Sequence, residues 1–157
     1  MSTGGVITGT PGAGDLGGSP YTVIVTASDP NSLAISDTFA LVINGRPDIV
    51  STLADLAVEI GTPVNVDVAS SFDDPEGDAL SFIAGGLPPT LSLSNDGVLS
   101  GTPDVNDLVD SPFIVTVTAV DPFGATVDDA FNLEVLPGLF ADGFESGDTS
   151  AWDVIVP

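Results

Sequence analysis

A tight cluster of acidic residues offers the clearest chemistry in this sequence. The stretch DDPEGD (73–78) contributes Asp73, Asp74, Glu76 and Asp78, and Pro75 and Gly77 fix a bend between them. Carboxylate oxygens are ligands that Ca²⁺ prefers, and like charges held this close repel each other unless a cation lies among them. The alternative interpretation is a set of solvated turn acids in an acidic protein, and the residues alone leave both open.

The rest of the composition removes most other chemistry. The chain has no His and no Cys, so imidazole bases, thiolate nucleophiles, disulfides and ordinary zinc sites are excluded. A single basic residue, Arg46, stands against 23 acidic ones, and the net charge of -22 repels nucleic-acid phosphates and anionic lipids. Paired acids can hydrolyse glycosides, but turns this short offer little cleft. We therefore expect no enzymatic activity and no nucleic-acid partner.

The elements that must position the acids are predicted to be short β-strands. The 18 Gly and 13 Pro residues indicate many turns, and the 43% hydrophobic content favours a buried core. No segment has sustained helical spacing. Alternation and turn signals predict strands at 21–28, 36–44, 64–69, 79–84, 91–93, 98–100, 113–120 and 125–136, and a leading strand over 48–60 that is split near residues 54–55.

Several phrases occur twice, 92 residues apart. GVITGTP (5–11) matches GVLSGTP (97–103), SPYTVIVTASDP (19–30) matches SPFIVTVTAVDP (111–122), and DTFALVI (37–43) matches DAFNLEV (129–135). This period fits a seven-stranded immunoglobulin-like sandwich of about 100 residues. We predict a complete repeat over 45–136, the C-terminal half of a truncated repeat over 1–44, and an acidic Gly-rich tail over 137–157.

The half repeat raises a stability problem, because a lone hairpin is marginal in water. We expect residues 1–44 to pack on the complete repeat, to pair with another copy as a strand-swapped dimer, or to remain poorly ordered. No apolar run approaches the roughly 18 residues that span a bilayer, so no membrane insertion is expected. The opening MSTGGVITGTPGAGDL lacks the features of a signal peptide, so any export signal is expected elsewhere.

Three segments carry a family resemblance. FDDPEGDALSF (72–82), GGLPPTLSLSNDGVLSGTP (85–103) and VTVTAVDPFGATVDDAFNLEV (115–135) resemble the dystroglycan-type cadherin-like repeat. The same region is similar to the immunoglobulin-like repeats of bacterial surface proteins. The resemblance implies an all-β fold, a seven-stranded Greek-key immunoglobulin/cadherin-like sandwich. It also implies an extracellular or cell-surface location, with calcium as the expected cofactor.

The resemblance also implies a ligand set. In such folds the DDPEGD loop and the loop that begins at Asp121 share one end with the N-terminal linker, here NGRP (44–47). Carried over residue by residue, the implied calcium ligands are Asp74, Glu76 and Asp121, followed by Asp78 and Asn44. The chain departs from cadherins at LSGTP (99–103), where a ligand segment is missing, and its exit linker LPGLF (136–140) has no carboxylate. At most one fairly complete site is therefore expected.

Two functions remain open at this point. The first is a non-catalytic, calcium-binding spacer or adhesion element of a larger exported bacterial-type protein, with neighbouring repeats as partners. The alternative is a carbohydrate-binding accessory module of a secreted polysaccharide-degrading enzyme, with polysaccharide as the partner. The tail phrase DGFESGDTSAW (142–152) resembles a phrase near the ends of exported bacterial proteins and the first strand of jelly-roll carbohydrate-binding modules. A short flap, an anchoring signal and the start of another domain are the interpretations left open for it.

Overall fold

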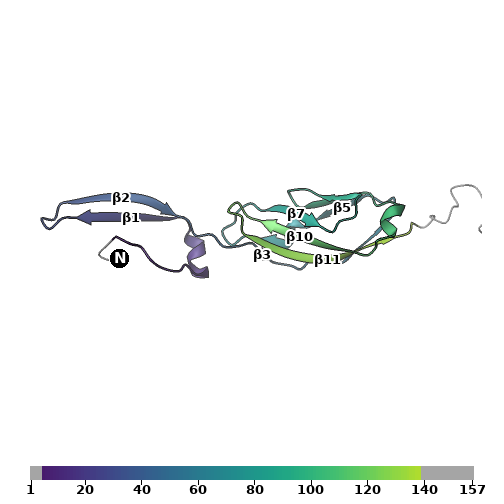
Figure 1. Ribbon diagram of the computed structural model, residues 1–157, viewed down its shortest axis with the longest axis horizontal. Helices are drawn as coiled ribbons and strands as arrows, with labels where there is room; N and C mark the ends of the chain where they lie inside the picture. Colours follow the sequence, from purple (N-terminus) through teal and green to yellow (C-terminus); the bar gives the residue numbers. More distant parts are fainter. Residues whose placement is uncertain (1–4, 139–157) are drawn as a thin grey trace, which may run out of the picture.

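The computed structural model describes residues 5–138, so the tail predicted over 137–157 lies outside the described residues apart from its first two. The described chain consists of strands joined by turns and three short 3₁₀ turns (Figure 1). The strands are β1 (Tyr21–Ser28), β2 (Ala34–Leu41), β3 (Asp48–Ile49), β4 (Leu56–Glu59), β5 (Val64–Asp67), β6 (Phe72–Asp73), β7 (Ser81–Gly85), β8 (Leu91–Leu93), β9 (Val98–Gly101), β10 (Phe113–Val120) and β11 (Thr126–Leu136). The 3₁₀ turns are η1 (Ala13–Gly18), η2 (Ala69–Ser71) and η3 (Val105–Leu108).

Seven of the strands from β3 to β11 form a sandwich of two sheets. One sheet has the order β4-β11-β10-β7 and the other has the order β5-β9-β8, while β3 and β6 make a short separate pair. All of these contacts are antiparallel except that β4 runs parallel to β11. The prediction of an all-β, immunoglobulin/cadherin-like sandwich is confirmed.

The core lies between the two sheets and follows from the alternation along the strands. Val115, Val117 and Ala119 of β10 are buried, and so are Phe131 and Leu133 of β11. The intervening residues face outward, because successive side chains of a strand point to opposite faces. Residues from the opposite sheet close the core: Val64, Leu91 and Leu99.

The strand boundaries agree with the sequence at most places. β1, β8 and β10 coincide with their predicted ranges, and the leading strand is split as predicted, into β3 and β4. β6 was not predicted, because its two residues carry no alternation, and it forms through pairing of Asp48 with Asp73 and of Ile49 with Phe72. β5 ends at Asp67 rather than at residue 69, because the chain turns into η2 there.

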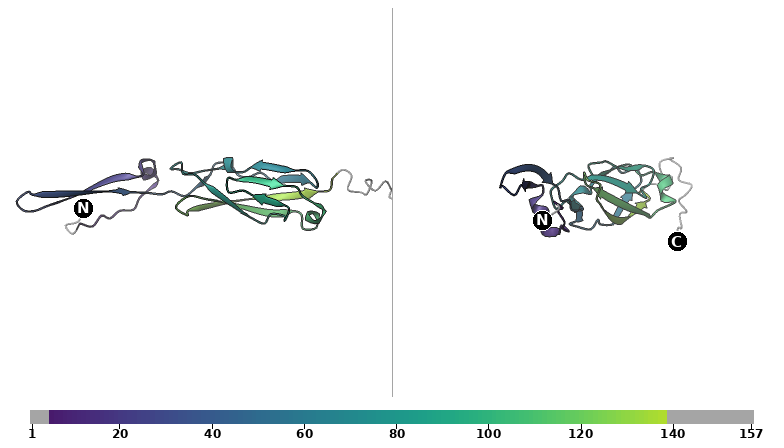
Figure 2. Two further views of the ribbon diagram at one scale, coloured as in Figure 1. Left: turned by 90° about the horizontal axis from the view of Figure 1, so that it is seen from above. Right: turned by 60° about the vertical axis from the view of Figure 1, so that its left-hand side comes forward.

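The first two strands form a separate hairpin. β1 and β2 pair only with each other among the described residues, and the hairpin projects away from the sandwich (Figures 1 and 2). Every residue of β2 is exposed. Of the three outcomes expected for residues 1–44, packing on the complete repeat is therefore not the one that the described residues adopt. No helix in the described part of the chain is both long and apolar enough to cross a lipid bilayer.

Candidate metal centre

The acidic loop after β6 is folded around Asp74. One carboxylate oxygen of Asp74, Oδ1, accepts hydrogen bonds from the backbone N–H of Glu76 (3.0 Å) and of Asp78 (3.2 Å). The Asp74 carbonyl accepts a third bond from the N–H of Gly77, whose φ of +76° is left-handed backbone that favours glycine. The loop is therefore rigid, and the Asp74 side chain, only 4% exposed, is held inside it.

Glu76 connects this loop to the linker that follows the hairpin. Its Oε2 accepts a hydrogen bond from the backbone N–H of Gly45 at 3.0 Å. The neighbouring Asn44 donates from Nδ2 to Oδ2 of Asp121 at 2.7 Å. Two consecutive linker residues thus contact two acids that come from different turns of the sandwich.

Asp121 occupies the turn between β10 and β11. Its Oδ1 accepts bonds from the N–H groups of Phe123 and Ala125, both at 2.8 Å, and the side chain is buried. The hydrogen bond from Asn44 is the main cause that lowers the pKa of Asp121. Burial opposes this shift, and the backbone donors of the turn add to it. Asp121 is therefore held as a carboxylate at neutral pH.

Three buried oxygen atoms near this junction have no hydrogen-bond partner. They are Oδ1 of Asn44, Oδ2 of Asp74 and Oε1 of Glu76. Each belongs to a side chain whose other polar atom is already used, and each is almost fully shielded from solvent. A buried acceptor without a donor costs about 1–3 kcal/mol, and more when it is charged. Such a concentration of unsatisfied acceptors calls for a positive group.

The carboxylates also lie close together in space. Asp74, Glu76 and Asp78 each present an oxygen within 4.8 Å of the others. The predicted residues thus fall into two groups, these three acids and the Asn44–Asp121 pair. The two groups are connected by Gly45, which follows Asn44 in the chain and donates its N–H to Glu76.

Sequence reasoning missed two contributors to this region. Gly45 takes part through its backbone N–H, for which a sequence gives no signal beyond its position next to Asn44. Asp96, from the turn between β8 and β9, lines a hollow of about 290 Å³ together with Asp73, Asp74 and Asp78. The Asp-Gly turn that carries Asp96 was visible in the sequence, but its proximity to the DDPEGD loop depends on how the sheets pack against each other.

The donor set fits a hard cation. All available ligand atoms are carboxylate or amide oxygens, which suits Ca²⁺ or Mg²⁺ and not the softer metals that select nitrogen or sulfur. Ca²⁺ takes six to eight oxygen ligands in flexible geometry, whereas Mg²⁺ demands a near-ideal octahedron and keeps several waters. An irregular set of buried oxygens from a loop, a turn and a linker therefore favours Ca²⁺.

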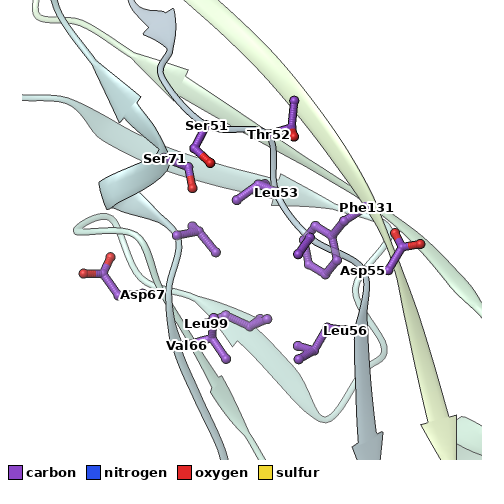
Figure 3. A pocket seen from close by; sticks show the side chains of 12 residues that line it. Ser51, Thr52, Leu53, Asp55, Leu56, Val66, Asp67, Ser71, Leu99 and Phe131 are labelled. Carbon is purple, nitrogen blue, oxygen red and sulfur yellow. The ribbon is translucent and has the colours of Figure 1, made fainter.

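A separate apolar pocket lies beside the leading segment, with a volume of about 330 Å³. Figure 3 shows Leu53, Leu56 and Phe131 converging on it, with Asp55 and Asp67 on opposite sides. Asp55 accepts from the backbone N–H and the side chain of Asn132, and these bonds lower its pKa. A general acid for glycoside hydrolysis needs a raised pKa, so Asp55 is not suited to that role.

Comparison with known proteins identifies the family to which the residues of the sandwich belong. A family model described as "Putative Ig domain" matches residues 47–136, which is more than half of the chain. A search of curated proteins found no match.

Solved structures with a similar fold include human mucin-like protocadherin EC1-2 (14% identity, TM-score 0.49), where the alignment covers 84% of this chain and 74% of that one. Drosophila N-cadherin EC1-3 gives 12% identity and a TM-score of 0.48, covering 75% and 43% of the two chains. A nucleoside hydrolase-related hypothetical protein from Saccharophagus degradans, associated with carbohydrate metabolism, gives 17% identity and a TM-score of 0.47, covering 60% and 26%. The chain thus spans less than half of the last two proteins.

Proposed function

The chain belongs to the putative Ig domain family, and on this premise we propose that it is a non-catalytic extracellular module that binds calcium at the junction between hairpin and sandwich. In this role it acts as a spacer or adhesion element within a larger exported protein. Neighbouring repeats are its natural partners.

One observation carries the proposal. The buried, unpartnered oxygens of Asn44, Asp74 and Glu76 come from a linker and a loop that meet at one end of the sandwich. A bound Ca²⁺ at this junction would give buried acceptors a positive partner and would neutralise the repulsion between the carboxylates. Asp78 and Asp121 would complete the oxygen set, with Asp78 close to Asp74 and Asp121 held in place by Asn44.

The ion would also have a structural consequence at the linker. Asn44 and Gly45 already contact Asp121 and Glu76, so the linker belongs to the site and is not a free tether. A cation that adds bonds to the linker and to the loop would restrict the angle between the hairpin and the sandwich. Restriction of that angle is what a spacer requires.

The aromatic side chains support the spacer role over carbohydrate binding. A sugar platform needs exposed rings, but Phe72, Phe82 and Phe131 are buried in the core. Among the aromatic side chains of the described sandwich, Phe123 is the most exposed, at 60%. One ring in a tight turn is a small platform for a polysaccharide.

The test is calcium titration of the full chain after removal of divalent ions with a chelator. We expect heat of binding and a rise in melting temperature, since a ligand at 100 times its Kd stabilises the folded state by about 2.7 kcal/mol. Asp74→Asn removes one charge while it keeps a side-chain oxygen. We expect this variant to weaken calcium binding by about tenfold or more, because ligand charge tunes the affinity of such sites.

Glu59→Gln is the matched control. Glu59 is exposed and pairs with Leu136, at the end of the sandwich opposite to Asp121, so its loss changes net charge equally without touching the site. Equal calcium affinities for Asp74→Asn and Glu59→Gln, or no melting shift of the wild-type chain at millimolar calcium, would sink the proposal.

A further inference from the structure

The hairpin and the last two strands of the sandwich have the same local structure. β1 and β10 differ by 92 residues at both ends, and the pairing of Tyr21 with Leu41 in the hairpin corresponds to that of Phe113 with Leu133 in the sandwich. The rest of the two registers keeps the same offset, down to Ser28 with Ala34 and Val120 with Thr126. The repeat is therefore a repeat of structure as well as of sequence.

Polar contacts around the two hairpins match as well. Asp29 accepts from the N–H of Asn31 and Leu33, as Asp121 does from Phe123 and Ala125. Ser19 Oγ accepts from the N–H of Ile43 at 2.9 Å, and Ser111 Oγ accepts from that of Val135 at 2.8 Å. Asp15 and Asp107 likewise each accept from the N–H three residues earlier.

The two hairpins differ in the strands that surround them. In the sandwich, β7 pairs with the outer edge of β10, β4 pairs with the outer edge of β11, and β5, β9 and β8 lie across the inner face. The hairpin has neither edge strand nor facing sheet within the described residues. Its inner face, defined here as Val23, Val25, Ala27, Phe39 and Leu41, consists of the counterparts of five core residues.

The exposure of matched side chains shows the difference. Phe39 is 44% exposed, whereas its counterpart Phe131 is 5% exposed. Leu41 is 41% exposed, and its counterpart Leu133 is fully buried. The inner face therefore has the shape and apolar character of half a core.

Residues 5–9 point to the same missing cover. The sequence GVLSG (97–101) contains strand β9, which pairs with β5 and β8. Its counterpart GVITG (5–9) forms no strand. A Cβ at Gly101 would clash with the carbonyl oxygen of Thr90, whereas the counterpart Gly9 has open space around it. A Cβ at Gly9 would clash only if a counterpart of the Thr90 segment lay beside it. Glycine at this position therefore fits a chain in which that counterpart is present.

We propose that the inner face and both edges of the hairpin bind the front half of an immunoglobulin-like repeat, a segment with the strand pattern of residues 45–96. We assign this occupant to the same polypeptide, joined ahead of Gly5 through a turn equivalent to Ser94–Gly97. In that register, counterparts of β7 and β4 pair with β1 and β2, and a counterpart of Thr90 reaches Asp15 as Thr90 reaches Asp107. This inference does not depend on calcium.

Strand swapping between copies of this chain does not cover the inner face of the hairpin. Within the described residues 5–138, each copy contains one front half, residues 45–96, and two back halves, residues 5–44 and residues 97–136. When a hairpin takes the front half of another copy, it displaces that copy's own β10 and β11. One back half per chain stays uncovered, whatever the number of copies.

The test compares the chain with a fused chain, in which a second copy of residues 45–96 is joined directly ahead of Gly5. Both proteins are measured in a buffer that contains a chelator, so that calcium is absent. Amide hydrogen exchange is measured for β1 and β2. We expect the fused front half to slow hydrogen exchange at the amides on the outer edges of β1 and β2 by about a hundredfold or more. These amides would then gain hydrogen-bond partners inside a cooperatively folded unit. The sandwich of residues 45–138 serves as the internal reference.

Two matched substitutions in the fused chain complete the test. Val25→Asp places a charge where Val117 is buried in the sandwich, and we expect it to abolish the new protection. Ile24→Asp changes the adjacent residue, which is on the outer face, and should leave the protection in place. The proposal would be overturned if the amides of β1 and β2 exchanged equally fast in the fused and unfused chains, or if the two substitutions had equal effects. Protection of β1 and β2 in the unfused chain through self-association would overturn it too, because a second copy would then be the occupant.

Discussion

Asn44 illustrates how one residue can serve a charged site without adding charge. Its Nδ2 donates to Asp121, which keeps that carboxylate in position, while its Oδ1 remains buried and unpartnered. An aspartate in the same place would supply an oxygen but would lose the donor and would increase the repulsion around Asp121. The amide thus holds the Asp121 carboxylate through a hydrogen bond without adding a negative charge of its own.

Asp55 gives a prediction about pH that is separate from the calcium site. Hydrogen bonds from Asn132 lower its pKa below the usual 3.8. A carboxylate with a lowered folded pKa stabilises the fold above its unfolded pKa, and this contribution disappears as the pH falls through the folded value. We expect Asp55→Asn to reduce the urea midpoint at pH 7 and to have progressively less effect below pH 3.8.

The measurement is urea unfolding of both chains from pH 7 down to acid, in chelator. Asp67→Asn is a suitable control, because Asp67 is exposed and its carboxylate accepts a local hydrogen bond from the N–H of Ala69, two residues away. A difference between wild type and Asp55→Asn that stays constant with pH would contradict the assigned role of the Asn132 bonds.

At the scale of elements, the repeat supplies matched substitutions within one chain. Leu133 is fully buried in β11, and its counterpart Leu41 lies on the exposed inner face of the hairpin. We expect Leu133→Ala to lower the free energy of unfolding by about 2–5 kcal/mol, because it leaves a cavity in the core. Leu41→Ala should leave the unfolding of the sandwich nearly unchanged, within about 0.5 kcal/mol.

Chemical denaturation followed by a probe in the sandwich measures both free energies. Similar losses for the two leucine variants would mean that the hairpin unfolds together with the sandwich. The separation of the hairpin from the sandwich would then be wrong.

The sequence predicted elements better than it predicted their neighbours. The alternation in FIVTVTAV located β10 to the residue, because burial on one face imposes a period of two. The same alternation in YTVIVTAS located β1, yet nothing in it revealed that its inner face lacks a cover. β2 begins at Ala34, two residues before the predicted start, because pairing with Ser28 extends the hairpin. Pairing partners come from tertiary structure, which periodicity does not encode.

The candidate site shows the same division. Asp74, Glu76 and Asp78 lie within six residues, so their proximity follows from the loop itself. Asn44 and Asp121 are 77 residues apart, and only the family resemblance suggested that they belong to the same end. The bond from the Gly45 N–H to Glu76 was out of reach, since every non-proline residue has such a donor.

The whole molecule carries a charge that opposes its own folding. A net charge of -22 with a single basic residue leaves the acids with few opposite charges to pair with. We expect NaCl to raise the melting temperature in chelator, because the screening length falls from about 30 Å at 0.01 M to about 3 Å at 1 M. Differential scanning calorimetry over this range measures the effect.

An uncharged osmolyte such as sucrose provides the comparison for salt, since it stabilises by exclusion from the surface without screening. If NaCl left the melting temperature unchanged, self-repulsion would not be a major term in the stability of this chain.

The parallel pairing of β4 with β11 has a mechanical consequence. The linker enters the sandwich beside Asp121, and β11 leaves it at Leu136, at the other end. A pull on these two points draws β4 and β11 in opposite directions along their shared axis, so the hydrogen bonds between them are loaded together in shear rather than opened one by one. The hydrogen bonds between residues 56–59 and 133–136 must therefore break together before β4 can separate from β11.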